Sequence, residues 1–344
     1  MLNQININEL FKLYPDIPVM DVRSPGEFAQ GHISGAINLP LFNNEERAIV
    51  GTLYKNSGQK DAILAGLEIA GKKMRFLAEA GIKTAKNNQL ILHCWRGGMR
   101  SASVAWLFET CGITCYTLKG GYKNYRRYIL DYFNSPFKLL MLGGLTGSGK
   151  SDILDVLEKH QFQVLKLEVL AHHKGSAFGN LGKTPQNTNE QFENDIFSEL
   201  FPFDLSKPIF VEDESRNIGR NIIPGQLFDR MTTSPLIVVE LETGFRLSRL
   251  VEEYGKFPRE ELQECIMKIT KKIGGQNTRI AIESLNEGKP DIAAKISLLY
   301  YDKSYNFGLS LKKNSEIYRI EMENADPEPN AEKIINFLRG KKLI

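Results

Sequence analysis

Residues 90–101, Leu-Ile-Leu-His-Cys-Trp-Arg-Gly-Gly-Met-Arg-Ser, decide the fold of the first part of the chain. The apolar run 90–92 predicts a buried strand, and the pattern of residues 101–110 predicts a helix. Cys94 follows the strand, so we expect it above the carboxyl edge of a sheet and at a helix N-terminus. Backbone N–H groups and the helix dipole there stabilise a thiolate and hold an anion in front of it. The stretch therefore predicts a reactive cysteine in an anion-binding loop.

The residues that follow Cys94 suit such a loop. Two glycines allow the backbone to curl so that successive N–H groups point inward, and Arg100 closes the ring with a fork of donors. We predict Cys94 and Arg100 as catalytic residues. A buried cysteine that caps the strand is the alternative, because most free cysteines are core residues. The remaining residues of the predicted anion loop are Trp95, Arg96, Gly97, Gly98 and Met99.

Alternating strand and helix patterns surround this loop. Short segments at 19–23 and 114–118 predict further strands, and the period of residues 61–81 predicts one long helix. Alternation of this kind favours a parallel α/β domain.

The composition is that of an ordinary globular protein, with 25% charged and 42% hydrophobic residues and a formal net charge of +3. So small a charge does not indicate nucleic-acid binding, which must depend on local basic patches. We find no signal-peptide pattern and no apolar run near the ~20 residues of a membrane span, so we expect a cytoplasmic protein without a membrane partner. The four cysteines lack the paired spacing of a zinc site, and we expect no structural metal.

A second motif follows Asn134-Ser135-Pro136, where we expect the domain boundary. The strand pattern 137–142 leads into Gly144-x4-Gly149-Lys150-Ser151, a full Walker A match that opens a helical pattern. The alternative, a chance match, is disfavoured by this strand–loop–helix context. Loop N–H groups and Lys150 would hold a diphosphate. The predicted diphosphate-binding residues are Gly144, Thr146, Gly147, Ser148, Gly149, Lys150 and Ser151.

These two motifs predict two domains, at residues 1–134 and 137–344. The second is expected to be a P-loop NTPase-like parallel α/β domain with a helical C-terminal part, because the sequence from Glu252 onward turns helical.

Acidic residues at 212–214 end an apolar strand pattern, in the position of a Walker B segment. One of them could hold Mg²⁺, and the candidate ligands are Ser151, Glu212 and Asp213. A strand end with solvated charges is the alternative. The Walker A loop indicates diphosphate recognition, which leaves ATP binding and hydrolysis open.

Two further segments are candidates for substrate contact. Residues 119–128 alternate basic and aromatic side chains, which suits RNA but equally suits a connecting helix whose tyrosines pack between domains. Residues 172–179 form a Gly-containing loop with two histidines, for which a plain surface loop is the alternative. The candidate contacts in these segments are Lys123, Arg126, Arg127, His173 and Ser176.

Residues 21–38 resemble the entry signature of the rhodanese superfamily, which also contains certain phosphatases. The carrying residues are Asp21-Val22-Arg23-x3-Glu27-x3-Gly31-His32-Ile33-x-Gly35-Ala36-x-Asn38, followed by the cysteine loop. The resemblance implies a rhodanese-like domain in which Asp21 and Glu27 are mostly architectural and His32 fixes a turn. Five residues separate Cys94 from Arg100, one more than in the usual sulfurtransferase loop and as many as in the phosphatases. Loop length alone leaves sulfur or selenium transfer and phosphate-ester attack open.

The combination of both domains is similar to the tRNA 2-selenouridine synthase family. The residues that carry this resemblance are Asn43-Asn44-Glu45-Glu46-Arg47-x-x-Val50-Gly51-Thr52-x-Tyr54-Lys55, Cys94-x-Arg96-Gly97-Gly98-x-Arg100-Ser101, Gly120-Gly121-Tyr122-Lys123, Thr146-Gly147-Ser148-Gly149-Lys150, Gly175-Ser176-Ala177-Phe178-Gly179 and Glu212-Asp213-Glu214-Ser215-Arg216.

This resemblance implies that wobble 2-thiouridine of certain tRNAs becomes 2-selenouridine, with selenophosphate as the donor and an S-geranyl intermediate made from geranyl diphosphate. It implies that Lys150 stabilises the leaving diphosphate and that Cys94 acts in selenation, as selenium acceptor or nucleophile. Gly66 matches a family glycine and is carried over as a close-approach site. A selenophosphate-supplying enzyme is an expected partner. The alternative function is a sulfurtransferase or phosphatase with a fused regulatory P-loop NTPase.

Overall fold

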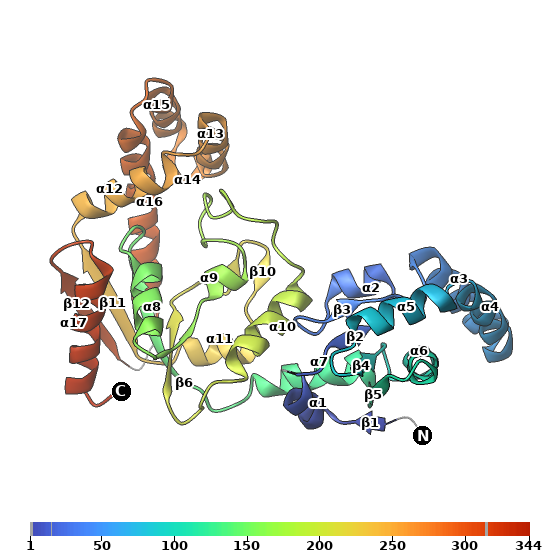
Figure 1. Cartoon of the computed structure of the whole chain (residues 1–344). Helices are drawn as coiled ribbons and strands as arrows, with labels where there is room; N and C mark the ends of the chain where they lie inside the picture. Colours follow the sequence, from blue (N-terminus) through green and yellow to red (C-terminus); the bar gives the residue numbers. More distant parts are fainter. Residues whose placement is uncertain (1–2, 15, 314–315) are drawn as a thin grey trace. The chain divides into compact units, whose positions relative to one another are not determined.

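Two five-stranded sheets, both entirely parallel, organise the chain in the computed structural model, which describes residues 3–14, 16–313 and 316–344 (Figure 1). The predicted parallel α/β class is therefore confirmed. The described residues form two compact units, of which the first consists of residues 1–132 with 193–198 and the second of residues 133–192 with 199–344. The domain division at 134–137 stays a prediction.

The sheet of the first unit has the strand order β1-β5-β4-β2-β3. Its central strand β4 is buried and ends directly before Cys94, as the apolar run predicts. Parallel pairing brings the carboxyl ends of β2, β4 and β5 to one edge, where the cysteine loop lies. The strands are β1 (Asn3–Ile5), β2 (Val19–Asp21), β3 (Ile37–Asn38), β4 (Gln89–His93) and β5 (Thr114–Leu118).

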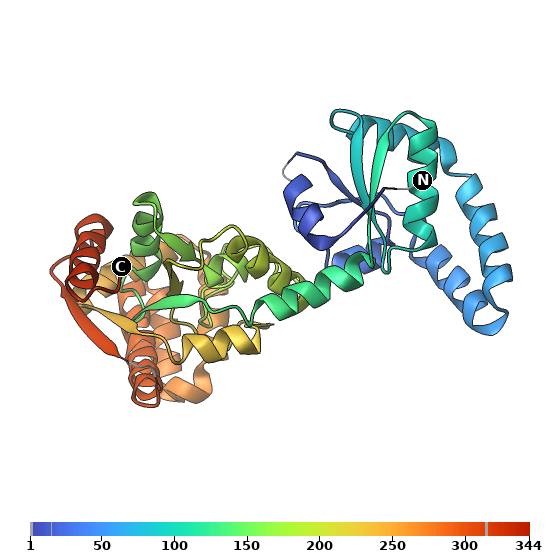
Figure 2. The same cartoon turned by 90° about the horizontal axis from the view of Figure 1, so that it is seen from below.

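Two helix predictions for this unit are wrong in their bounds. The single helix expected at 61–81 is two helices, α4 and α5, separated at residues 72–73 after Gly71. The helix after the cysteine loop begins at Met99 instead of Ser101, so Arg100 belongs to its first turn. Helices α3 and α4 lie side by side at one edge of the unit (Figure 2). The helices are α1 (Ile7–Leu13), α2 (Pro25–Gln30), α3 (Asn44–Asn56), α4 (Gln59–Gly71), α5 (Met74–Thr84), α6 (Met99–Thr110) and α7 (Gly121–Tyr132).

A buried ion pair lies at the carboxyl end of β2. Nη2 of Arg23 is 2.6 Å from Oδ2 of Asp21, and both side chains are at most 1% exposed. The guanidinium also donates to the carbonyl of Gly31 at 2.7 Å and covers the ring of Tyr122 at 3.8 Å. His93 is the strand neighbour of Asp21, and burial lowers its pKa to about 4, so its ring is neutral at neutral pH. The architectural role expected of Asp21 agrees with this geometry.

The second sheet has the order β12-β11-β6-β8-β7. Strand β12, paired in parallel with β11, was not expected from the sequence. Its apolar residues share a core with β6, α8 and α17. The elements are β6 (Lys138–Gly144), α8 (Lys150–Lys159), β7 (Gln163–Leu165), β8 (Pro208–Glu212), β11 (Leu236–Leu241), β12 (Ile317–Met322) and α17 (Pro327–Gly340).

Helices gather at one end of the second unit, around the long helix α16 (Figure 1). This confirms the predicted helical C-terminal part. No helix among the described residues is long and apolar enough to cross a membrane. The remaining elements are α9 (Leu167–Leu170), α10 (Asn189–Leu200), β9 (Asn217–Ile218), β10 (Asn221–Ile222), α11 (Gly225–Met231), α12 (Thr243–Tyr254), α13 (Arg259–Lys268), α14 (Thr270–Ile273), α15 (Gly275–Asn286) and α16 (Pro290–Ser310).

The Asp21–Arg23 pair predicts a large effect of Asp21→Asn on stability. We expect chemical denaturation to show a loss of about 3 kcal/mol or more, because Arg23 would stay buried without its counter-charge. The control is Glu68→Gln, which breaks an exposed ion pair with Lys72. That variant should change the unfolding free energy by less than about 0.5 kcal/mol. Equal effects of the two variants would contradict the assigned role of the buried pair.

Candidate functional site

The thiol of Cys94 lies at the base of the strand-to-helix turn between β4 and α6. Its Sγ accepts the backbone N–H of Gly98 at 3.3 Å and lies 3.3 Å from Oγ of Ser101. The side chain is 3% exposed, while Trp95 and Met99 on the loop are exposed. The turn thus directs one amide and one hydroxyl at the sulfur, as expected for a cysteine at a helix N-terminus.

Close backbone contacts fix the shape of this loop. Gly97 has φ +64°, and a Cβ there would lie 2.4 Å from the carbonyl oxygen of Leu118. Gly121 has φ +57°, and a Cβ there would lie 2.3 Å from the carbonyl oxygen of Cys94. Side chains are excluded at both positions, because they would meet backbone that cannot move aside.

The start of α7 also holds the cysteine loop by hydrogen bonds. Backbone N–H groups of Tyr122 and Lys123 donate to the carbonyl oxygens of Cys94 and Trp95, each at 2.9 Å. The Gly-Gly-Tyr-Lys segment therefore supports the loop through its backbone, a role that the sequence did not indicate.

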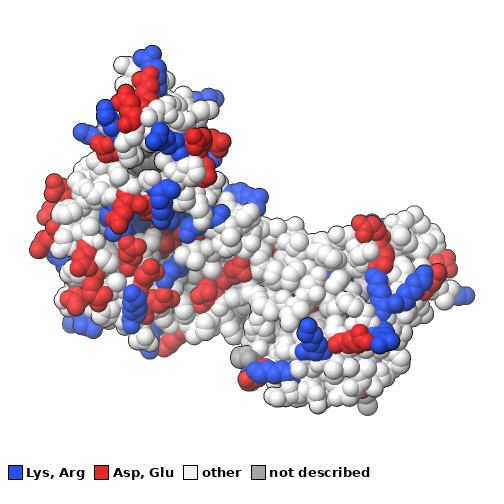
Figure 3. Space-filling model, turned by 45° about the horizontal axis from the view of Figure 1, so that its top comes forward, with Lys and Arg blue, Asp and Glu red and all other residues white. Residues whose placement is uncertain are grey.

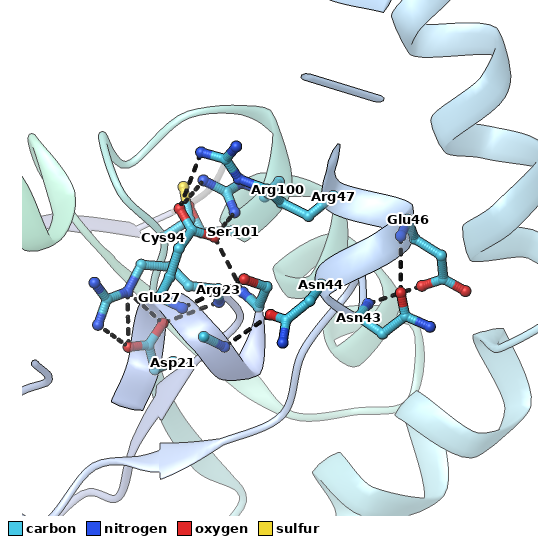
Figure 4. Close-up of polar contacts among 12 residues, drawn as sticks. Asp21, Arg23, Glu27, Asn43, Asn44, Glu46, Arg47, Cys94, Arg100 and Ser101 are labelled. Carbon is cyan, nitrogen blue, oxygen red and sulfur yellow. Dashed lines mark hydrogen bonds and ion pairs between the residues drawn. The ribbon is translucent and has the colours of Figure 1, made fainter. Parts of the chain in front are cut away.

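Arg100 points to Glu27, the acid that the sequence had assigned to architecture. Nη1 of Arg100 lies 2.7 Å from Oε2 of Glu27, and Arg47 lies 3.7 Å from the same carboxylate (Figure 4). Burial would raise the pKa of Glu27, but hydrogen bonding and charge from Arg100 outweigh it and lower that pKa. Glu27 also caps α2 by accepting the N–H of Ser24 at 3.1 Å, which agrees with the architectural role that the rhodanese resemblance implies.

The Asn-Asn-Glu-Glu-Arg segment at 43–47 joins α3 to this region. Asn43 and Glu46 form a capping box at the start of α3, and Oδ1 of Asn44 accepts the N–H of Gly26 at 2.8 Å. Both contacts brace the α2–α3 pair, so that Arg47 is placed beside Glu27 (Figure 4).

The Walker A loop joins β6 to α8 in the second unit, and α8 begins at Lys150. Nζ of Lys150 donates to the carbonyl of Gly144 at 3.2 Å. Oγ of Ser148 is buried, and the described residues offer it no hydrogen-bond partner. An orphaned hydroxyl and an ammonium group beside a helix N-terminus fit an anionic ligand such as a diphosphate.

Carboxylates gather next to this loop. Oε2 of Glu212 accepts the N–H of Glu168 at 2.7 Å, and Oε2 of Glu168 is 3.5 Å from Oγ of Ser151. Burial and the charge of Glu168 raise the pKa of Glu212 to about 8, and the same causes raise that of Glu214. Sequence reasoning missed Glu168, because its element, α9, is only one turn long.

The candidate Mg²⁺ ligands have other contacts in this structure. Asp213 pairs with Lys312 and lies 3.5 Å from the hydroxyl of Tyr305. Within the described ranges, no three His, Cys, Asp or Glu side chains are arranged to hold a metal ion. Mg²⁺ binding by Ser151, Glu212 and Asp213 stays a prediction.

Comparisons with protein families match both the part of the chain that carries the cysteine loop and the part that carries the Walker A loop. The model "tRNA 2-selenouridine synthase AAA domain" matches residues 137–327, and the model "Rhodanese-like domain" matches residues 7–128. A tRNA 2-selenouridine synthase of Nitrosomonas europaea is 40% identical over 73% of this chain and 67% of its own length. One from Aeromonas salmonicida is 35% identical over 90% of this chain and 91% of its own length.

The chain belongs to the tRNA 2-selenouridine synthase family. The predicted fold, a rhodanese-like domain followed by a P-loop domain, is confirmed by the same matches. As a selenouridine synthase it is an enzyme that modifies tRNA.

The candidate tRNA contacts of this synthase lie on α7. Lys123 and Arg127 are exposed, whereas Arg126 pairs with Glu193 and donates to Oδ1 of Asn194 at 2.6 Å. Both acceptors belong to the segment 193–198 of the first unit. On the face drawn in Figure 3, acidic and basic side chains are intermixed, in agreement with the small net charge.

The tyrosines of α7 are packed in the first unit. Tyr122 and Tyr125 are at most 1% exposed, and Tyr128 and Tyr132 contact the ring of Phe197 at centroid distances of 6.0 and 5.1 Å. The buried tyrosines cannot present their faces to RNA bases. The basic residues of α7 remain candidates for phosphate contact.

The other candidate contacts have clear structural surroundings. Gly66 is buried in α4, where a Cβ would lie 3.3 Å from the ring of Phe42, so the close approach there is to this ring. Nδ1 of His173 accepts the N–H of Gly175 at 3.1 Å, which shapes the 172–179 loop. Ser176 lines an apolar cavity, described below.

Gly121→Ala tests the support of the cysteine loop. We expect it to cost about 2 kcal/mol or more, because the new Cβ would displace the backbone of Cys94. The matched control is Gly112→Ala, at φ +84° with open space around it, which should cost only about 1 kcal/mol of backbone strain. Thermal unfolding of both variants measures the difference. Equal losses would show that the contact with Cys94 contributes nothing.

The raised pKa of Glu212 predicts a pH dependence of stability. The folded state keeps a proton that the unfolded chain releases, so the unfolding free energy falls as pH rises from about 5 to 8. Glu212→Gln removes this ionisation, so its melting temperature relative to wild type should rise by about 2 °C or more across that range. Glu332→Gln, an exposed position on α17, is the control. A pH-independent difference between Glu212→Gln and wild type would contradict the assignment.

Proposed function

We propose that this enzyme converts wobble 2-thiouridine of tRNA to 2-selenouridine in two steps, one at each strand-to-helix anion loop. The observation that carries the proposal is the presence of both loops, a buried thiol at the Cys94 turn and a Walker A turn at Lys150, in one chain of this family. Because the substrate is tRNA, we place the reaction in the cytoplasm, with a selenophosphate-supplying enzyme upstream.

The first proposed step is geranyl transfer at the Walker A loop. The sulfur of 2-thiouridine forms a bond to C1 of geranyl diphosphate, the C1–O bond breaks, and the N3 proton of the base is lost to solvent. The leaving diphosphate carries the growing negative charge. Lys150 and the amides at the start of α8 stabilise that charge. This transfer of the geranyl group requires no ATP.

Mg²⁺ would supply further charge neutralisation to the departing diphosphate. Ser151 and the neighbouring carboxylates are the residues that would hold it. Binding of Mg²⁺ would displace the proton that the raised pKa of Glu212 retains, because a carboxyl group ligates the ion in its ionised form.

The second proposed step uses selenophosphate at the Cys94 loop. Selenium replaces the geranyl-thio group at C2, and overall one selenophosphate and one water yield 2-selenouridine, geranyl thiol and phosphate. Amides of the loop and the guanidinium of Arg100 hold the phosphoryl group while the Cys94 thiolate attacks its phosphorus, and the P–Se bond breaks to release hydrogen selenide anion. That anion adds to C2 and expels the geranyl thiolate, and water hydrolyses the S–P bond to return the Cys94 thiol and phosphate. Arg100 can release Glu27 to bind the incoming anion, since both compete for the same guanidinium.

Two variants separate the steps. Cys94→Ala should lose selenation at least ~100-fold and keep geranylation, and Lys150→Ala should lose geranylation at least ~100-fold, because each removes a group that acts in one step. Mass spectrometry of nucleosides from thiolated tRNA measures both products. Cys111→Ala, at an exposed cysteine, and Lys159→Ala, on the far end of α8, are the matched controls. Normal selenation by Cys94→Ala would exclude the proposed role of the thiol.

A further inference from the structure

An apolar cavity opens in the second unit beside the Walker A loop. It contains about 590 Å³ of space, counting the part that is open to solvent. Helices α12, α13, α15 and α16 form most of its wall, and residues of the 172–179 loop complete it. All side chains that line it are uncharged, with aliphatic and aromatic groups predominant.

Thr146 of the Walker A loop is part of the cavity wall, so the cavity and the diphosphate site are continuous. Helix α12 connects the two regions. Arg246 and Arg249 of this helix lie against the Walker A loop. A Cβ added at Gly147 would lie 2.9 Å from the carbonyl oxygen of Arg246, and one added at Gly149 would lie 3.5 Å from Cζ of Arg249. One turn further along, Leu250 and Tyr254 face the cavity.

Three hydroxyl groups in the wall, those of Ser176, Ser297 and Tyr301, already have hydrogen-bond partners. Oγ of Ser297 donates to the carbonyl of Ala293 at 2.9 Å, and the hydroxyl of Tyr301 accepts the N–H of Ala177 at 3.0 Å. Oγ of Ser176 accepts the N–H of Phe178 at 3.2 Å. In the described part of the chain, the buried side-chain atoms that lack a partner all lie outside this wall. The wall therefore suits hydrocarbon, because a nucleoside would need polar partners for its base and ribose.

We propose that this cavity binds the hydrocarbon chain of a prenyl diphosphate whose diphosphate lies on the Walker A loop. The inference rests on the proposed function. It adds where the hydrocarbon chain of the prenyl donor binds and how the enzyme selects the length of that chain. Burial among α12, α13, α15 and α16 removes the apolar chain from water, while the anionic head stays at the start of α8. Side chains that narrow or widen the cavity should then change the preferred chain length.

Two cavity variants test this selection. Ala294→Phe on α16 fills the cavity from a half-buried position, and Leu250→Ala on α12 widens it. Relative to wild type, Ala294→Phe should raise the ratio of kcat/KM for dimethylallyl diphosphate to that for geranyl diphosphate by ~10-fold or more. Leu250→Ala should raise the ratio for farnesyl over geranyl diphosphate by a similar factor. The control Leu299→Phe adds the same ring on α16 at a residue that is 68% exposed and outside the cavity. Unchanged chain-length ratios in folded cavity variants would overturn the proposal.

A binding experiment separates this inference from the proposed reaction. Calorimetry compares inorganic diphosphate with geranyl S-thiolodiphosphate, an analogue that does not transfer its chain. We expect Ala294→Phe to weaken the analogue ~10-fold and to leave inorganic diphosphate unchanged. If wild type binds the analogue no more tightly than inorganic diphosphate, the cavity proposal fails. If the variant selectively loses the analogue but wild type transfers no prenyl group, only the proposed reaction fails.

Discussion

The backbone contact between Gly121 and the carbonyl of Cys94 is the constraint on which the first site depends. It holds the first residues of the loop against the start of α7, and the thiol of Cys94 meets the N–H of Gly98 within the same turn before α6. The Walker A loop obeys the same principle, with α8 beginning at Lys150 directly after a glycine turn. Both sites are strand-to-helix turns of parallel sheets, which place amide donors and a helix N-terminus together.

Charge compensation distinguishes the two sites. At the cysteine loop, the carboxylate of Glu27 neutralises and orients the guanidinium of Arg100. Guanidinium groups bind carboxylates and phosphoryl groups with the same forked geometry. At the Walker A loop, acids crowd one another and keep protons, because burial and mutual repulsion raise their pKa values. At the first site the cation is paired with a carboxylate, while at the second site the carboxyl groups reduce their mutual repulsion by keeping their protons.

Local spacing was enough to predict the parallel fold class, the position of Cys94 after a strand and the Walker A turn before α8. Long-range contacts could not be predicted in this way. Glu27 lies 73 residues from Arg100 in the chain, and Glu168 approaches Glu212 across 44 residues. The same holds for β12, which pairs with β11 although its own sequence lies among helical patterns. The apolar cavity is also a product of packing, because its wall comes from residues between Thr146 and Tyr301.

The central claim is that two separate anion sites perform two separable steps on one tRNA. The most direct test supplies purified S-geranylated tRNA and selenophosphate, without geranyl diphosphate, to wild type and to Lys150→Ala, and follows 2-selenouridine by mass spectrometry. The account predicts equal rates for the two proteins, since Lys150 belongs only to the first step. Loss of selenation in the folded Lys150→Ala enzyme, with wild type active, would contradict it.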